Sequence, residues 1–194
     1  MSSTNLVLGI FVGGKSTRMG GQPKGLLPAP GGSETLLARA LRIAAEALPD
    51  APRVLVGDAS PYAGFGCPTL ADDPANIGPL GGLRALLLEA RRLQTSHAIA
   101  LSCDLPHFSL SLLLRLVAEA PEALALAPRD EDRWQPFFAR YATEPALAAV
   151  EQALSAGDRS LQRVLQRLPP TELVLSPAEH AELTDWDSPE DVGT

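Results

Sequence analysis

Three cations and a run of glycines follow one apolar stretch near the start of the chain. Leu6 to Val12 is rich in Val, Ile and Phe, as expected of a buried strand, and it leads into the segment GGKSTRMGGQPK. Lys15, Arg18 and Lys24 place positive charge in this segment, which contains no acidic residue although the whole chain has a net charge of -7. Glycine backbone groups and fixed cations suit a phosphate. The segment is therefore predicted to bind an anion.

Gly9 to Ser16 also fits the P-loop pattern G-x-x-x-x-G-K-[ST]. A P-loop lysine opens a helix, whereas Gly20, Gly21 and Pro23 would break a helix that began there. Gly9 also falls inside the apolar stretch rather than after it. We therefore interpret the P-loop match as accidental.

Carboxylates follow two further apolar stretches. Asp104 comes shortly after His97–Ser102, and Asp72 and Asp73 close a stretch that begins at Cys67. Mg²⁺ bound to a nucleoside triphosphate takes one or two carboxylates together with phosphate oxygens, so Asp104 is a candidate metal ligand. The alternative for each Asp is a hydrogen bond within a turn or a helix cap.

The elements that must position these residues alternate between strands and helices. Strands are predicted at Leu6–Val12, Arg53–Gly57, Cys67–Asp72, His97–Ser102, Leu124–Ala127, Arg133–Tyr141 (turning back antiparallel) and Glu172–Leu175. Helices are predicted from Leu36 to Leu48 with Ser33 as N-cap, at Leu83–Leu93, from Ser109 to Ala120, at Glu144–Leu154 and Ser160–Leu168, and for one turn from Ser188.

This alternation predicts one α/β domain over residues 1–194, a three-layer α/β/α structure with a mostly parallel, doubly wound, Rossmann-like sheet. Ligands bind such sheets at the carboxyl ends of the strands. The glycine-rich segment, Asp72, the glycines from Gly78 to Gly82 and Asp104 each follow a predicted strand. We expect all four to meet at one edge of the sheet.

Composition restricts the class of protein. The acidic balance argues against a nucleic-acid partner, because nucleic-acid binding depends on neutralising phosphates. Cys67 and Cys103 form neither a disulfide framework nor a metal spacing. The sequence has neither a signal-peptide pattern nor an apolar run of membrane-spanning length. We therefore expect a cytoplasmic protein without a membrane partner.

The glycine-rich segment resembles the signature of the molybdenum cofactor guanylyltransferases. That signature is G-G-x-S-x-R-M-G followed by a lysine, here Gly13 to Gly20 and then Lys24. Asp72 to Gly82 resembles the family segment D-x₅-G-P-L-x-G, and Cys103 to Pro106 resembles its C-D-x-P segment. The resemblance extends from Leu8 to Asp191.

The resemblance implies an Mg²⁺-dependent enzyme that transfers GMP from GTP to molybdenum-bearing molybdopterin and releases pyrophosphate. It implies catalytic roles for Lys24, Arg18 and Asp104, and a metal site at Asp104 and Asp187. The residues implied in nucleotide binding are Phe11, Val12, Gly13, Gly14, Ser16, Lys24, Gly57, Asp72, Gly78, Gly81 and Asp104. We expect a monomer whose partners are GTP, the pterin, and proteins that deliver the pterin or receive the cofactor.

Several positions depart from the family pattern. Asp185 and Asp187 replace two asparagines of N-x-N-T-P-E-D, Gly57 stands where an asparagine is common, and Phe11-Val12 replaces Leu-Ala. A carboxylate only accepts hydrogen bonds, whereas an amide also donates them. The substrate therefore stays open between GTP and CTP, with a sugar-phosphate nucleotidyltransferase or a non-catalytic nucleotide-binding protein as further alternatives.

Overall fold

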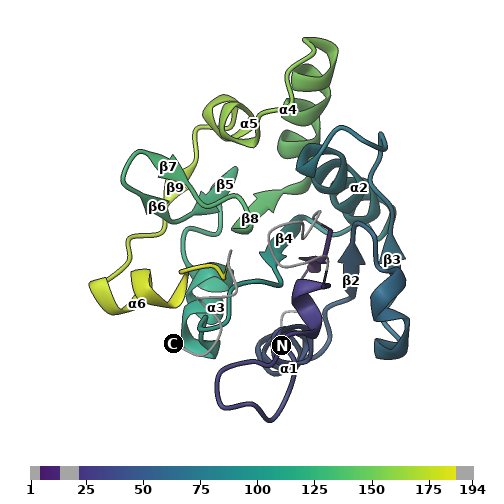
Figure 1. The fold of residues 1–194 in the computed structure, drawn as a ribbon. Coiled ribbons are helices and arrows are strands. Elements are labelled where there is room, and N and C mark those ends of the chain that lie inside the picture. The colour runs from purple at the N-terminus through teal and green to yellow at the C-terminus, as the bar shows by residue number, and fades with distance from the viewer. Residues whose placement is uncertain (1–4, 14–21, 187–194) are drawn as a thin grey trace.

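The structure is a computed structural model and describes residues 5–13 and 22–186 (Figure 1). Within these residues seven strands form one sheet in the order β3-β2-β1-β4-β8-β5-β9. Their bounds are β1 (Leu6–Phe11), β2 (Arg53–Val56), β3 (Thr69–Leu70), β4 (His97–Ser102), β5 (Ala125–Ala127), β8 (Phe138–Ala142) and β9 (Thr171–Glu172). A separate hairpin joins β6 (Arg129–Asp130) and β7 (Arg133–Trp134).

The sheet is parallel except at β8, which pairs antiparallel with both β4 and β5. The prediction that residues 133–141 turn back antiparallel is therefore confirmed for the second half of that range. Its first half belongs to the β6–β7 hairpin instead. Pairing places Phe11 of β1 next to Val56 of β2 and Ser102 of β4, so these three strands end together.

Helices cover both faces of the sheet and confirm the three-layer α/β/α prediction (Figure 1). Leu8 and Ile10 of β1 share one core with Leu37 and Leu112, whereas Val7 on the other face shares a second core with the helices there. This alternation is the period-two pattern of a strand that is buried on both faces. The helices are α1 (Leu36–Ala47) and α3 (Leu110–Ala118) on one face, and α2 (Pro79–Arg92), α4 (Thr143–Ser155) and α5 (Leu161–Arg167) on the other.

Gly9 lies in the middle of β1, under helix α2. A Cβ at this position would come 2.7 Å from both methyl carbons of Leu86, so the absence of a side chain lets the helix pack closely on the strand. Gly9 therefore has a packing role in the middle of the strand. A P-loop helix would begin at Lys15, which lies outside the described residues.

Two local predictions need correction, and one helix was missed. The N-cap of α1 is Thr35, whose hydroxyl accepts from the Ala38 amide at 3.3 Å, and not Ser33. Helix α2 begins at Pro79 rather than near Leu83, because proline fits the first helical turn and the glycines that follow stay helical. Helix α6 (Pro177–Glu182) was not predicted.

The strand predicted at Glu172–Leu175 is β9 and shares only Glu172 with that prediction, and the strand predicted at Cys67–Asp72 is reduced to β3. The other predicted elements in the described residues are present with small shifts at their ends. Ser109 caps α3, with its hydroxyl accepting from the Leu112 amide at 3.1 Å. Gly157, with a φ of 69°, separates α4 from α5 as expected. The final turn predicted from Ser188 lies outside the described residues. Among those that are described, none of the helices has both the length and the apolar character needed to cross a membrane.

Candidate active site

Lys24 and Asp104 meet at the carboxyl edge of the sheet. The Lys24 Nζ lies 3.0 Å from Asp104 Oδ2, although the two residues are 80 positions apart in the sequence. Their side chains are 17% and 19% exposed, so the ion pair is partly shielded yet open to a ligand. The predicted meeting of the glycine-rich segment with Asp104 is confirmed at this pair.

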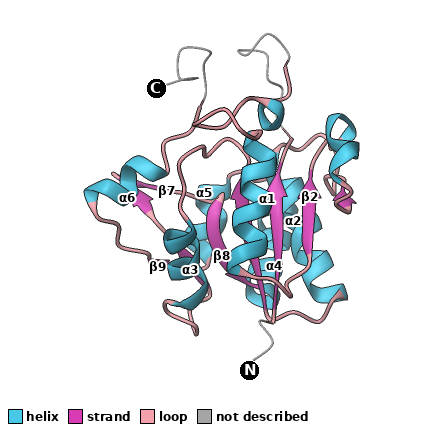
Figure 2. Ribbon diagram, turned by 90° about the horizontal axis from the view of Figure 1, so that it is seen from below, coloured by secondary structure: helices cyan, strands magenta, loops and turns pink. Residues whose placement is uncertain are grey.

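Local structure fixes both partners of the pair. Lys24 starts a short 3₁₀ turn, η2 (Lys24–Leu26), and Asp104 lies two residues after the end of β4. The hydroxyl group of Ser102, the last residue of β4, donates to Asp104 Oδ1. Cys103 donates its amide to the Phe11 carbonyl at 3.1 Å, which joins the ends of β4 and β1. In Figure 2 the arrowhead of β2 points to the edge where these strands end.

Gly13 and Gly57 form a close backbone contact beside this pair. Gly57 follows β2 with a φ of 104°, and a Cβ there would lie 2.8 Å from the Gly13 Cα. An L-residue is disfavoured in this backbone conformation as well as by the contact. The contact explains why a glycine occupies position 57 in this chain, where the family commonly has asparagine.

Asp72 lies over the glycines at the start of α2. A Cβ at Gly82 would come 3.1 Å from Asp72 Oδ1, and a Cβ at Gly81 would come 2.5 Å from the Pro74 carbonyl oxygen. Burial raises the pKa of the Asp72 carboxyl group above its usual value. Gly78 is the N-cap residue of α2, Pro79 has no amide hydrogen, and the Gly81 amide donates to the Gly78 carbonyl at 3.0 Å, so the first helical turn lies directly beside this carboxyl-bearing loop.

Phe11 and Val12 are buried at the end of β1. The Phe11 ring packs against Phe137, with ring centroids 4.5 Å apart, and the Val12 amide donates to the Val56 carbonyl at 3.0 Å. A Cβ at Gly82 would lie 2.8 Å from the Phe11 ring. The Phe11 ring therefore packs beneath Gly82, next to Asp72, on the α2 face of the sheet.

The C-terminal segment also reaches Asp104. The Trp186 amide donates to the Asp104 carbonyl at 3.0 Å, and the Trp186 ring packs with Leu27 and Leu36. Asp185 therefore lies one residue from a direct contact with the Asp104 backbone. Asp187, the second predicted metal ligand, lies outside the described residues, as do Gly14, Ser16 and Arg18.

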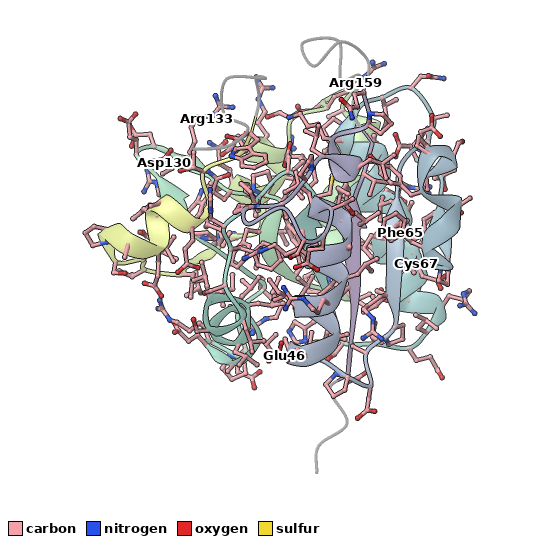
Figure 3. All side chains as sticks on the ribbon, turned by 60° about the horizontal axis from the view of Figure 1, so that its bottom comes forward. Glu46, Phe65, Cys67, Asp130, Arg133 and Arg159 are labelled. Atoms are coloured by element: carbon pink, nitrogen blue, oxygen red, sulfur yellow. The ribbon has the colours of Figure 1, made fainter. Side chains whose placement is uncertain are left out.

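A cavity of about 370 Å³ adjoins this C-terminal segment. Its lining residues are Pro128, Arg129, Asp130, Gln135, Leu175, His180, Ala181, Leu183, Thr184 and Asp185. Asp130 and Arg133 of the β6–β7 hairpin lie on the opposite side of the molecule from Phe65 and Cys67 (Figure 3). The cavity therefore occupies the hairpin side, away from β3.

The donor set at Asp104 fits Mg²⁺ when a triphosphate is present. The described residues contain no group of three His, Cys, Asp or Glu side chains that could hold a metal by themselves. Mg²⁺ usually keeps water and takes only one or two carboxylates beside substrate phosphates. Asp104, at an open strand end beside a cation, is suited to supply such a carboxylate.

Two residues that support the site were not predicted from the sequence. Ser102 donates to Asp104, and its position two residues before the carboxylate at a strand end is a usable signal. Tyr62 accepts a hydrogen bond from the Gly25 amide at 3.2 Å, next to Lys24. No sequence pattern connects a tyrosine to a glycine 37 residues earlier.

The fold is an α/β nucleotidyltransferase fold, and the sequence comparisons place the chain in that class of enzyme. The chain belongs to the family of the MobA-like NTP transferase domain, whose family model matches residues 9–172. Its relatives include the molybdenum cofactor guanylyltransferase of Pseudomonas fluorescens (strain SBW25), which is 34% identical over 184 residues that cover 93% of this chain and 88% of the relative. The enzyme of the same name from Pseudomonas entomophila (strain L48) is 31% identical over 93% of both chains.

Solved structures share this fold. Molybdopterin-guanine dinucleotide biosynthesis protein A from Archaeoglobus fulgidus aligns with a TM-score of 0.72 and 21% identity, covering 95% of this chain and 94% of that one. The 2-C-methyl-D-erythritol 4-phosphate cytidylyltransferase from Thermus thermophilus aligns with a TM-score of 0.62 and 16% identity, covering 95% and 94%. At such identities the likeness concerns the fold.

Proposed function

We propose that this protein transfers GMP from GTP to molybdenum-bearing molybdopterin, forming the guanine dinucleotide cofactor and releasing pyrophosphate. The observation that carries the proposal is the Lys24–Asp104 pair, a cation and a carboxylate joined at 3.0 Å at the carboxyl edge of the sheet. The names of the relatives at 34% and 31% identity support the choice of substrates.

The Lys24 ammonium suits the negative phosphates of a magnesium triphosphate, and the Asp104 carboxylate suits its Mg²⁺. Lys24 would shift from Asp104 to the α-phosphate, and Arg18 with the amides of the glycine-rich segment would hold the β- and γ-phosphates. These cations stabilise negative charge that moves onto the leaving pyrophosphate in the transition state. Fixed cations at such positions lower the barrier because they need not reorganise during the reaction.

The acceptor phosphate is ionised at neutral pH, so attack on the α-phosphorus requires no general base. Catalysis then consists of positioning the two substrates in line and neutralising charge. Asp104 and Asp187 would hold Mg²⁺. The metal, when bound, supplies further neutralisation of triphosphate oxygens.

Asp72 and the start of α2 are placed to receive the nucleoside. The Asp72 carboxyl group lies near Gly57, Gly81 and Gly82, whose missing side chains let this loop pack closely against β2 and the start of α2 and so fix where Asp72 would meet a base or ribose. A carboxylate can accept from the adjacent N1–H and 2-amino groups of guanine together, whereas cytosine offers it a single amino group, and this difference favours GTP. The acceptor would use the 370 Å³ cavity, which Asp185 lines beside the segment docked on Asp104.

Thermal unfolding with GTP, CTP, UTP or ATP, each with and without Mg²⁺, tests the nucleotide assignment. A ligand that binds the folded chain raises the melting temperature by mass action. We expect the largest rise with GTP and Mg²⁺ together. A largest rise with CTP would instead support transfer of CMP to the same pterin.

Turnover is then measured as pyrophosphate release with GTP, Mg²⁺ and molybdenum-loaded molybdopterin. Pyrophosphate that appears only when the pterin is present, together with the dinucleotide product, supports the proposed transfer. Nucleotide binding without any release at high pterin concentration would contradict it and favour a non-catalytic nucleotide-binding protein.

A further inference from the structure

Tyr62 is a buried residue whose hydroxyl group lies beside the catalytic lysine. It belongs to the 3₁₀ helix η3 (Ser60–Phe65), is 3% exposed, and packs its ring against Phe65 with centroids 6.4 Å apart. Phe65 lies on the β3 side of the molecule (Figure 3). Asp58 fixes the start of η3, because its carboxylate accepts from the Ser60 amide at 3.1 Å and from the Ser60 hydroxyl at 2.6 Å.

The Tyr62 hydroxyl accepts a hydrogen bond from the amide of Gly25 at 3.2 Å. Gly25 follows Lys24 in η2, and its amide is one of the donors at the start of a helical turn that have no partner within the turn. Pro23, the N-cap residue of η2, provides no side-chain hydrogen bond to this turn. Tyr62 therefore acts as the missing cap from a distant part of the chain.

The close approach of the two segments depends on glycine. A Cβ at Gly25 would come 2.9 Å from the Tyr62 ring, so a larger residue would push η2 away from η3. Gly25 is itself buried. Because Gly25 and Lys24 share a peptide unit, whatever holds the Gly25 amide also fixes the backbone from which the Lys24 side chain extends to Asp104.

We propose that Tyr62 is a positioning residue for Lys24. Its hydroxyl group holds η2 against η3, so that the Lys24 ammonium is kept at the carboxyl edge of the sheet. The consequence for turnover rests on the proposed function, whereas the placement of Lys24 does not.

The electrostatic surroundings keep this hydroxyl group neutral. Burial raises the pKa of Tyr62 to about 12, and the neighbouring Cys103 and Asp104 add to the rise. The group therefore stays protonated at neutral pH, and its oxygen serves as a constant acceptor.

Selective acylation of lysine provides a test that needs no substrate. The chain contains only two lysines, Lys15 and Lys24. Acylation with succinimidyl acetate, followed by peptide mass spectrometry, therefore gives the rate of acylation at Lys24 relative to the rate at Lys15. An ammonium group held in an ion pair reacts slowly. In Tyr62→Phe, we expect the rate at Lys24 relative to Lys15 to rise about threefold or more, because neighbours in one network are coupled.

Tyr141→Phe is the matched control. Tyr141 is also fully buried, and its hydroxyl donates to the Pro136 carbonyl at 2.8 Å, far from Lys24 in the second core. Both variants lose one buried hydrogen bond, so both should melt at lower temperature, but only Tyr62→Phe should change the ratio. Asp104→Asn, which removes the ionic contact between Asp104 and Lys24, should raise the ratio and so establishes that the assay reports this ion pair.

An unchanged ratio in Tyr62→Phe, or an equal change in Tyr141→Phe, overturns the proposal. If Tyr62→Phe fails to fold, amide hydrogen exchange in the wild-type chain decides. The Gly25 amide should then exchange as slowly as the paired amides of β1, and rapid exchange would equally overturn the proposal.

Kinetics extend the test to the reaction. In a double-mutant cycle, Tyr62→Phe should lower kcat by about fivefold in the wild-type background and have no further effect in Lys24→Ala, since coupled residues are non-additive. Equal effects in both backgrounds would overturn a role that acts through Lys24. A wild-type chain that transfers no nucleotide refutes the proposed function, and the acylation ratio still decides the role of Tyr62.

Discussion

At the scale of single residues, the Lys24 ammonium and the Asp104 carboxylate form an ion pair at 3.0 Å. The pair keeps a cation and a carboxylate together at one strand end, where each charge lowers the cost of partly burying the other. Less than a fifth of each side chain is exposed, and a triphosphate can reach the pair through this exposed part. Its exchange for phosphate and metal contacts is the central step of the proposed binding mode.

Lys24→Ala should lower turnover about a hundredfold or more, the usual effect of losing one fixed charge donor to the transition state. Stability should fall by about 1–3 kcal/mol, because the variant takes one charged hydrogen-bond donor from the Asp104 carboxylate, which is only 19% exposed. Steady-state kinetics and thermal unfolding measure the two effects.

Lys15→Ala is the comparison for that variant. Position 15 varies in the family signature, so we expect a clearly smaller loss of turnover than in Lys24→Ala. A P-loop enzyme would give the reverse order, because its lysine contacts the β- and γ-phosphates. Near-normal turnover in Lys24→Ala would remove this lysine from the mechanism.

Asp104→Asn keeps the shape of the side chain but loses the charge that suits Mg²⁺. We expect activity to collapse, while the melting temperature of the chain by itself changes little. Added Mg²⁺ should stabilise the wild type in the presence of GTP and do so much less for the variant. A variant that unfolds readily yet keeps its rate per folded molecule would make Asp104 a structural cap.

At the scale of elements, the start of helix α2 determines the shape of the nucleotide side of the site. Because Pro79 rather than Leu83 opens the helix, Gly81 and Gly82 lie in its first turn, where both are buried. Their missing side chains allow the loop from Asp72 to Gly78 to pack directly on helical backbone. The Asp73 amide donates to the Gly81 carbonyl at 3.1 Å and completes this attachment.

Gly81→Ala should weaken both folding and nucleotide binding. Its Cβ would lie 2.5 Å from the Pro74 carbonyl oxygen, so the loop that carries Asp72 must move. We expect a loss of about 1–3 kcal/mol, the range for overpacking in a close contact, and a smaller rise in melting temperature with GTP. Denaturant titration and the thermal-shift assay measure these effects.

Gly64→Ala is the control for that prediction. Gly64 has open space around its Cβ position and lies in η3, outside the α2 contact. This variant should fold and respond to GTP as the wild type does. An equal loss in both variants would show that close packing at Gly81 is not the cause.

At the scale of the whole molecule, Arg140 links the sheet to helix α3. It lies in β8, is 2% exposed, and donates to four carbonyl groups at the end of α3, those of Leu116, Val117, Glu119 and Ala120. A guanidinium group at a helix C-terminus also interacts favourably with the helix dipole. The antiparallel strand and the helix layer are thereby held together far from the nucleotide site.

Arg140→Met should lower the free energy of unfolding by about 2–3 kcal/mol, because it leaves several carbonyl groups without a donor. Arg91→Met, which removes an exposed ion pair with Glu144, should cost less than about 1 kcal/mol. Both variants should retain the rate per folded molecule. Denaturant unfolding measures the first effect, and equal losses would contradict the assigned role of Arg140.

The sequence by itself determined the order of strands and helices along the chain and the sheet edge at which the glycine-rich segment meets Asp104. Buried parallel strands such as β1 and β4 are continuous apolar runs, and this pattern is local, so it can be read without the fold. The same holds for the N-cap at Ser109. Because parallel strands end at one edge, the meeting of the glycine-rich segment with Asp104 followed from the pattern alone.

Only the tertiary structure decided which side chains touch there. The Lys24–Asp104 distance, the cap that Tyr62 provides to Gly25 and the docking of Trp186 on Asp104 join segments that are far apart in the sequence. The first turn of α2 depends likewise on the close fit of Gly82 against Phe11 and Val56, which lie far away in the sequence. Such contacts depend on packing among many non-local neighbours, and no local pattern of residue types encodes a distance of this kind.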